Sequence, residues 1–321
     1  MKWAILGTGN IATKFAVGLT ALGSRAALRA VGSRNPESAR AFAAQHGATV
    51  SGDYAAVLAD PQVEVVYIAL PNQEHAPWTI RAAQAGKHVL CEKPAAMNLA
   101  ELDTMLAAVR AAGTFFMEGF LWRCHPRTAL LRQLAADLGE PRMAHAVFCF
   151  DGGRPLKGRL ASPAYGGGAL MDVGCYPISW LRLFGGEPQT LSASATLEGG
   201  VDVHCAGSLR FASGLLGSFA TSVQCVQPNL NTLHGAHGSL SVHEPWRNPP
   251  GAPLIVKTTS GERTYITEDT GLPIHALEAL HVQEHLANRE APGMTWEDSR
   301  GQQHTLDLLR QAIGVRWPSE G

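Results

Sequence analysis

A glycine-rich turn near the N-terminus has the residue types and the spacing of an anion-binding site. Gly7, Gly9 and Ala12 follow the apolar run 2–6 and precede a helical pattern that continues to Leu22. Gly7 permits a tight turn, Gly9 lets the backbone approach a pyrophosphate, and Ala12 is small enough for the helix to pack on the strand. The free N–H groups and the dipole of the helix N-terminus favour an anion there. This context predicts a dinucleotide-binding turn made by Gly7, Thr8, Gly9, Asn10, Ile11 and Ala12.

The end of the second predicted strand indicates which dinucleotide is bound. A site that prefers NAD places an acidic residue there, on the ribose hydroxyls. This sequence has Ser33 and Arg34 instead. An arginine can bind a 2′-phosphate with two hydrogen bonds, so we expect NADP in preference to NAD. Glu37 could still bind a ribose hydroxyl, so use of NAD stays open, and a solvated loop arginine is the alternative reading of Arg34.

A lysine, an aspartate and a tyrosine could together move a proton. Lys93 directly follows the fourth predicted strand, at the sheet edge where ligands bind. Burial and a nearby oxidised nicotinamide would both favour its neutral, basic form. Tyr176 can carry a proton if a cation stabilises its phenolate, and Asp172 shares its helix face and could orient a substrate hydroxyl or hold Lys93. On spacing alone, two other readings stay open. Lys93 could be an ordinary turn lysine, and Asp172 and Tyr176 could be a helix pair whose tyrosine packs in the core.

Other candidate residues carry weaker signals. His75 begins a helix past the third predicted strand and could contact nicotinamide or substrate, and Trp122 and Arg123 could line a substrate site or serve packing. His281 and His285 have the spacing of two metal ligands on a helix. They lack the glutamate of an HExxH motif, so we expect an ordinary helix surface and no metal.

The first part of the chain alternates strands and helices. Five apolar runs read as strands, and helices of ten or more residues separate them. Such runs predict a parallel sheet covered on both faces, the doubly wound α/β (Rossmann) architecture. Asn98 is expected to cap the helix that ends at Gly113. The expected strands are 2–6, 28–32, 63–70, 88–91 and 114–117.

The second part predicts an α+β domain with a mostly antiparallel, open-faced sheet. Short β-type runs occur there, and the run 203–211 alternates polar and apolar residues. A helix over 169–184 interrupts them, and helices over 276–288 and 296–313 close the chain, the last of which could pack on the first domain. We expect domains at 1–120 and 121–321. The expected strands are 143–150, 191–197, 203–211, 215–223 and 239–242.

Composition excludes several classes of protein. The 321 residues correspond to about two domains, and the net charge of −1 gives no basic surface for nucleic acid or anionic membrane. The six cysteines form no CxxC pair, so we expect free thiols in a reducing cytoplasm. No apolar run reaches the ~18 residues of a membrane span, and the first strand leaves no room for a signal peptide.

Five segments resemble the glucose-fructose oxidoreductase/inositol dehydrogenase (Gfo/Idh/MocA) family. They extend over nearly the whole chain, and the combination of Glu-Lys-Pro with Asp-x-Gly-x-Tyr is specific. With a tyrosine at 176, the chain resembles the branch of dihydrodiol dehydrogenases, aldose (xylose) dehydrogenases and glucose-fructose oxidoreductase. Inositol dehydrogenases usually carry histidine there. The segments are Leu70–His75, Ala85–Pro94, Met117–Pro126, Gly166–Tyr176 and Ala312–Val315.

The resemblance implies hydride transfer between a nicotinamide cofactor and a sugar, polyol or trans-dihydrodiol. It suggests Lys93 and Tyr176 as the acid/base pair. Asp172, His75, Trp122 and Arg123 are the candidates for contact with the substrate. The resemblance also implies a homo-oligomer, dimer or tetramer, formed through the second sheet. Glucose-fructose oxidoreductase is exported through a leader that this sequence lacks, which favours a simple dehydrogenase. The cofactor-binding residues expected from these segments are Leu70, Pro71, Asn72, His75, Glu92 and Lys93.

Two other classes of function stay open. A non-enzymatic NAD(P)-binding sensor could use the same fold, because fold does not determine function. Such a protein would be free to lose Lys93, Asp172 and Tyr176, and all three are present. A purely structural oligomer subunit would explain the second sheet but not the glycine-rich turn.

Overall fold

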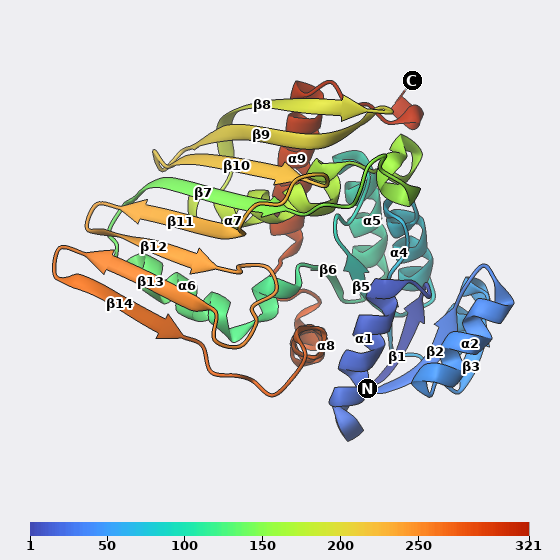
Figure 1. Cartoon of the computed structure of the whole chain (residues 1–321). Coiled ribbons are helices and arrows are strands. Elements are labelled where there is room, and N and C mark those ends of the chain that lie inside the picture. The colour runs from blue at the N-terminus through green and yellow to red at the C-terminus, as the bar shows by residue number, and fades with distance from the viewer. Residues whose placement is uncertain (321) are drawn as a thin grey trace. The chain divides into compact units, whose positions relative to one another are not determined.

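The computed structural model describes residues 1–320 and divides the chain into two compact units. The first unit combines Met1–Cys124 with Thr270–Arg300, and the second combines His125–Asp269 with the residues from Gly301 onward. Each unit contains one β-sheet (Figure 1). Within residues 1–320, no helix has both the length and the apolarity to cross a membrane.

The sheet of the first unit has six parallel strands in the order β3-β2-β1-β4-β5-β6. The strand order reverses between β1 and β4, and in such sheets this is where ligands bind, beyond the carboxyl ends of the strands. The predicted parallel Rossmann sheet is therefore confirmed. The strands are β1 (Lys2–Leu6), β2 (Ala27–Gly32), β3 (Val50–Gly52), β4 (Val65–Ile68), β5 (His88–Glu92) and β6 (Phe116–Gly119).

The helices of this unit begin and end where local signals place them. The Asn98 side chain accepts a hydrogen bond from the Glu101 N–H and caps α5, and Asn35 caps α2 in the same way. The pair β3 and α3 was not predicted, because three strand residues and six helix residues give too short a pattern. The helices are α1 (Asn10–Ala21), α2 (Pro36–His46), α3 (Tyr54–Ala59), α4 (His75–Gln84), α5 (Leu99–Ala112) and α8 (Ile274–His285).

The late helix α8 completes the first unit by packing against α1. Gly18 of α1 permits this contact, because a Cβ there would lie 2.8 Å from the backbone nitrogen of Ala276. Helix α9 (Trp296–Ala312) begins in the first unit, where its residues to Arg300 belong, and continues in the second. The expected closing helices are therefore present with nearly the expected bounds.

The second sheet has eight strands that lie side by side in Figure 1, in the order β14-β13-β12-β11-β7-β10-β9-β8. Its neighbours pair antiparallel except β7 with β10, so the mostly antiparallel sheet is confirmed. The strands are β7 (Pro141–Cys149), β8 (Pro188–Glu198), β9 (Val201–Phe211), β10 (Leu216–Ser222), β11 (Leu230–Gly235), β12 (Gly238–His243), β13 (Pro253–Thr258) and β14 (Gly261–Ile266).

Three of these strands and one helix were not predicted. Strands β11, β13 and β14 carry mixed polar residues and find their places by pairing along the sheet. Helix α6 (Pro126–Ala136) buries only Leu131, Leu134 and Ala135 as apolar residues, so its pattern is weak. His125 caps α6 and Pro126 is its first residue, which is the signal that could have revealed it.

The predicted helix over 169–184 divides into two parts. Leu170–Gly174 form a π-helical turn, η6, and Cys175–Gly185 form α7. The Gln302 side chain of α9 donates a hydrogen bond of 2.8 Å to the Cys175 carbonyl oxygen and ties the start of α7 to α9. π-turns of this kind are frequent at functional sites.

Candidate functional site

The glycine-rich turn joins β1 to α1 as predicted. Gly7 has φ +112°, and a Cβ there would lie 2.4 Å from the carbonyl oxygen of Ala69, which follows β4. Only glycine therefore lets the turn pass so close to the neighbouring strand end. The turn is thereby held at the point where the strand order reverses.

The N-terminus of α1 fits the pyrophosphate of a dinucleotide. A Cβ at Gly9 would have no heavy atom within 4 Å, so this face of the turn is open. No side chain caps α1 through a hydrogen bond, and its first turn carries no acidic residue. The leading N–H groups of the helix and its positive dipole end are thus available to a phosphate.

Arg34 lies at the carboxyl end of β2 with a neighbour that sequence reasoning missed. The Arg34 side chain is exposed, and its guanidinium and backbone N–H both hydrogen-bond the Tyr54 hydroxyl. Burial raises the pKa of Tyr54, and Arg34 partly opposes that shift. Ser33 is buried, and its hydroxyl accepts a hydrogen bond of 3.2 Å from the Asn35 N–H. Tyr54 thus positions the one cation that follows β2 directly.

Lys93 follows β5 in a backbone segment that buried carboxylates hold in place. Glu92 accepts a short hydrogen bond from the Tyr67 hydroxyl of β4. On the other side of Lys93, the Ala95 N–H donates a 3.0 Å hydrogen bond to Glu118 of β6. Glu92 and Glu118 are buried, so the segment around Lys93 is fixed from both neighbouring strands. Glu118 was not among the predicted site residues.

His75 reinforces the same segment from α4. Its Nδ1 lies 2.8 Å from the Pro94 carbonyl oxygen and its Nε2 lies 2.8 Å from the Leu70 carbonyl oxygen. Burial lowers the pKa of His75, and the two carbonyl oxygens oppose that shift. Both ring nitrogens are thus engaged with backbone, which is the geometry of a positioning residue. Contact of His75 with nicotinamide or substrate stays a prediction.

A further buried acid lies beside this network. Glu278 of α8 is fully buried, and its Oε2 lies 3.6 Å from Nδ1 of His275. Burial raises the pKa of Glu278, and the nearby Glu92 carboxylate adds to this shift while His275 opposes it. No pattern near residue 278 indicated the site, because the acid reaches it from a helix that is distant in sequence.

Trp122 and Arg123 lie in the short 3₁₀ turn η3 (Leu121–Cys124), at the end of the first continuous segment of this unit. Both side chains are buried. The Arg123 guanidinium lies 3.3 Å from the Gly293 carbonyl oxygen and 3.6 Å from the Asp298 carboxylate. These contacts tie η3 to the segment before α9, and a substrate contact of either residue stays a prediction.

In the second unit, Asp172 lies in η6 and Tyr176 follows in α7. Both are nearly buried. An Asp172 carboxylate oxygen lies 2.7 Å from the Arg159 guanidinium. The Tyr176 ring packs edge-on against Phe148 at 5.2 Å and against Trp246 at 5.6 Å. The tyrosine is thus held by aromatic packing, and Trp246 and Arg159 are neighbours that sequence reasoning missed.

Asp202 of β9 holds the start of this helical segment. Its carboxylate accepts a 2.7 Å hydrogen bond from the buried Leu170 N–H and another from Ala169. Burial raises the pKa of Asp202 to about 6, and the hydrogen bonds oppose the shift. Gly168 has φ +98°, and a Cβ there would lie 2.3 Å from Asp202 Oδ1. The last glycine of the Gly166–Gly168 run is therefore required by this cap.

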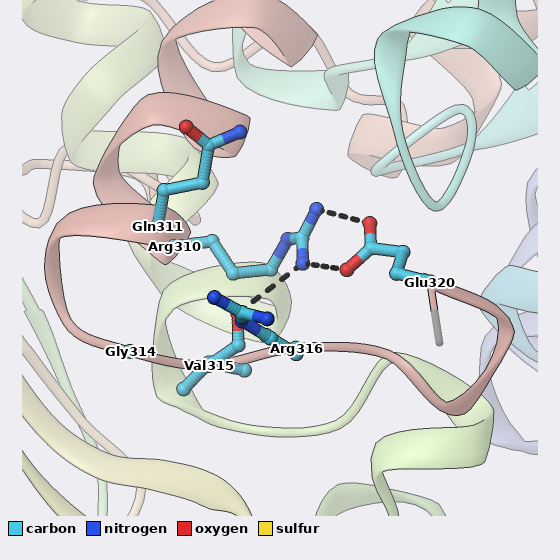
Figure 2. A pocket seen from close by; sticks show the side chains of 6 residues that line it. All are labelled: Arg310, Gln311, Gly314, Val315, Arg316 and Glu320. Atoms are coloured by element: carbon cyan, nitrogen blue, oxygen red, sulfur yellow. Dashed lines mark hydrogen bonds and ion pairs between the residues drawn. The ribbon is translucent and has the colours of Figure 1, made fainter.

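A separate cavity of about 320 Å³ lies near the C-terminus, away in sequence from these residues. Figure 2 shows the side chains that line it. Arg310 of α9 is buried and forms two hydrogen bonds of 2.6 Å with the Glu320 carboxylate. It also donates to the Val315 carbonyl oxygen at 3.2 Å. This arginine holds the C-terminal turn of the chain. The cavity is lined by Arg310, Gln311, Gly314, Val315, Arg316 and Glu320.

The predicted cofactor residues are brought together along one edge of the first sheet. They follow the carboxyl ends of β1, β2, β4 and β5, in agreement with a doubly wound site. Two family models match the chain, one described as an oxidoreductase family with an NAD-binding Rossmann fold over residues 1–120 and one as a GFO/IDH/MocA C-terminal domain over residues 129–241. The chain belongs to the GFO/IDH/MocA oxidoreductase family. The resemblance drawn from its motifs is thus confirmed.

Proteins similar to this chain include two dehydrogenases and a reductase. A trans-1,2-dihydrobenzene-1,2-diol dehydrogenase from Sus scrofa is 32% identical, over 100% of this chain and 99% of its own length. A D-xylose 1-dehydrogenase (NADP(+)) from Haloferax volcanii is 34% identical, over 84% of this chain and 81% of its own. The crystal structure of a 3-ketoreductase from Actinomadura kijaniata with NADP and TDP-benzene is 25% identical, with a TM-score of 0.88 over 98% of each chain. The chain is therefore an NAD(P)-binding oxidoreductase of this family.

Proposed function

We propose that this oxidoreductase transfers a hydride between NADP(H) and the CH–OH carbon of a sugar, polyol or trans-dihydrodiol. The observation that carries the proposal is Lys93, held at the carboxyl end of β5 on the same sheet edge as the glycine-rich turn. The dihydrodiol and xylose dehydrogenases among its relatives support the substrate class. When bound, the nicotinamide supplies or accepts the hydride.

The preference for NADP rests on the end of β2. Arg34 is exposed and oriented by Tyr54, and neither Ser33 nor Arg34 brings a carboxylate that would repel a 2′-phosphate. A guanidinium binds a phosphate through two charge-assisted hydrogen bonds. The relative from Haloferax volcanii, which is named for NADP, and the NADP complex of the 3-ketoreductase support this assignment.

In this proposal, Lys93 and Tyr176 handle the proton of the substrate hydroxyl. The hydroxyl must lose its proton as the hydride leaves in oxidation, and must regain one in reduction. Lys93 is held by the Glu92 and Glu118 contacts on either side of it, and Tyr176 is held by its aromatic neighbours. Asp172 orients the substrate hydroxyl or the acid/base pair. Trp122, Arg123 and His75 complete the substrate side.

The two parts of the chain divide this work. Residues 1–120 bind NADP, and residues 121–321 bind substrate and form a homo-oligomer. The second sheet supports the oligomer, because Met143 and Leu216 pair across β7 and β10 and remain 59% and 51% exposed. Neighbouring exposed apolar side chains on a sheet are typical of surfaces that a second copy covers. In this proposal, the protein lies in the reducing cytoplasm, where its six cysteines would stay free thiols.

The test is the absorbance of reduced nicotinamide with purified protein. Aldoses, inositols and trans-dihydrodiols are each supplied with NADP or NAD, and the reverse reactions are run in parallel. Turnover that is faster with NADP supports the proposal and narrows the substrate class. Tight NADPH binding without turnover on any of these substrates would contradict it and favour a non-enzymatic sensor.

A further inference from the structure

The C-terminal half of α8 gathers three metal-binding groups that the proposed oxidoreductase does not use. One ring nitrogen each of His281 and His285 and a carboxylate oxygen of Glu284 lie within 4.8 Å of one another. Residues three and four positions apart lie on one face of a helix, so the regular structure of α8 itself brings them together. The ring centroids of the two histidines are 4.5 Å apart.

Both imidazoles leave a nitrogen available for a ligand. Nδ1 of His285 donates a 2.8 Å hydrogen bond to the His281 carbonyl oxygen, which leaves Nε2 with its lone pair. A carbonyl partner on the second ring nitrogen is the usual support of a metal-binding histidine. Nε2 of His281 is buried, and within residues 1–320 no hydrogen-bond partner contacts it. A buried polar atom without a partner is uncommon in a folded protein.

Gly293 packs closely against this nitrogen. A Cβ at Gly293 would lie 2.9 Å from Nε2 of His281, so a larger residue there would press on the ring. The carbonyl oxygen of Arg123 lies 3.6 Å from the same point, so an oxygen atom is also near the ring. Glu284 is exposed and can rotate toward the two rings.

The geometry points to a binding site for one divalent transition-metal ion of the zinc class, made by His281, Glu284 and His285. Imidazole nitrogens and a carboxylate oxygen are ligands that Zn²⁺ accepts, at about 2.0–2.2 Å. Tetrahedral ligand atoms at such distances lie ~3.4 Å apart. The three ligand atoms already lie within 4.8 Å of one another, so side-chain rotation can bring them to that spacing. The three groups leave a position for water, and the ion would join two successive turns of α8.

The sequence indicated an ordinary helix surface at His281 and His285 because only one metal-binding motif was considered. The histidine pair was compared with HExxH, in which the glutamate follows the first histidine and acts as a base. Here Glu284 precedes the second histidine instead, as a third ligand on the same face. In this proposal, the helix surface expected from the sequence holds an ion through His281, Glu284 and His285.

The test is calorimetric titration with Zn²⁺ of tag-free protein that has been stripped with a chelator. A Cys225→Ser background removes an exposed free thiol that would itself bind zinc. We expect one ion per chain, an affinity about 10-fold weaker in Glu284→Gln, and about 100-fold weaker in His285→Ala. His281 is left unchanged because it packs against Gly293. Visible absorption of Co²⁺ in place of Zn²⁺ should be lost in His285→Ala.

His304→Ala is the matched control, because His304 is an exposed histidine on helix α9 outside the three-residue group. It should bind Zn²⁺ with the affinity of its parent. Circular dichroism and NADPH binding establish that each variant is folded. Two results would refute the site. One is a parent protein whose Zn²⁺ binding does not saturate at one ion per chain, and the other is Glu284→Gln and His285→Ala variants that bind Zn²⁺ as tightly as the parent.

Discussion

The cap made by Asp202 leads to a prediction with an unusual dependence on pH. Asp202→Ala removes a buried carboxylate that accepts hydrogen bonds from the Ala169 and Leu170 N–H groups. A buried donor left without an acceptor costs about 1–3 kcal/mol, so we expect a loss of about 2 kcal/mol near pH 8. The Asp202 contact lies at the start of the segment that carries Asp172 and Tyr176. Its loss should therefore loosen the backbone that positions these two proposed catalytic side chains.

The loss should increase in acid. The pKa of Asp202 is raised from 3.8 to about 6 in the folded chain. Between these values the folded chain holds a proton that the unfolded chain has released, so the contribution of Asp202 to stability increases as the pH falls through 6 and is lost as it rises. From about pH 8 to about pH 5, protonation contributes on the order of 1 kcal/mol, so the difference between Asp202→Ala and the parent should reach about 3 kcal/mol.

The measurement is urea unfolding of parent and variant at several pH values, with hydrogen exchange of the peptides over residues 169–184 as a local readout. Asp53→Ala is the control, since Asp53 is an exposed aspartate that caps α3 through the Ala56 N–H. Its effect should not increase as the pH falls. A difference for Asp202→Ala that stays constant, or shrinks in acid, would refute the reasoning, because burial would then not dominate at this carboxylate.

Three further predictions concern the cofactor and the reaction. Lys93→Met and Tyr176→Phe should each lower kcat by ~10²–10⁴-fold with nearly unchanged NADPH affinity by fluorescence titration, and full activity would remove that residue from the mechanism. Arg34→Ala should weaken NADP by about 10–100-fold, because two charge-assisted hydrogen bonds are lost, and should leave NAD nearly unchanged; equal losses in binding titrations would contradict the phosphate role. Gly7→Ala should abolish cofactor binding and lower Tm, because its Cβ would lie 2.4 Å from the Ala69 carbonyl oxygen, and a variant with parental binding and Tm would disprove this.

Local patterns were sufficient for most of the first sheet. The apolar runs, the asparagine cap at Asn98 and the closing Gly113 each act within a few residues, so the helices and strands could be found without tertiary contacts. The ends of β4 and β6 still differed from the predicted runs by two residues each. Strand ends depend on which neighbour supplies hydrogen bonds, and the apolar run alone does not specify that.

Elements with weak patterns required the rest of the fold. The Arg127 side chain of α6 donates hydrogen bonds to the His243 and Pro253 carbonyl oxygens, more than 100 residues away. Trp246 similarly donates to the Val147 carbonyl oxygen across 99 residues. Such contacts join α6 to β12 and β13, and the segment after β12 to β7, once the chain has folded back. They leave no local periodicity by which the sequence could reveal them.

The sequence by itself determined the chemistry of the candidate site: the glycine-rich turn, Arg34 where an acid would select NAD, and Lys93, Asp172 and Tyr176 in motifs of one family. These are properties of residue type and short spacing. Tertiary structure alone decided what holds them, because the supporting groups come from distant segments. Tyr54 reaches Arg34, and Asp202 caps Leu170 from 32 residues away. Burial and hydrogen bonding arise only when those segments meet, so positioning is a property of the fold.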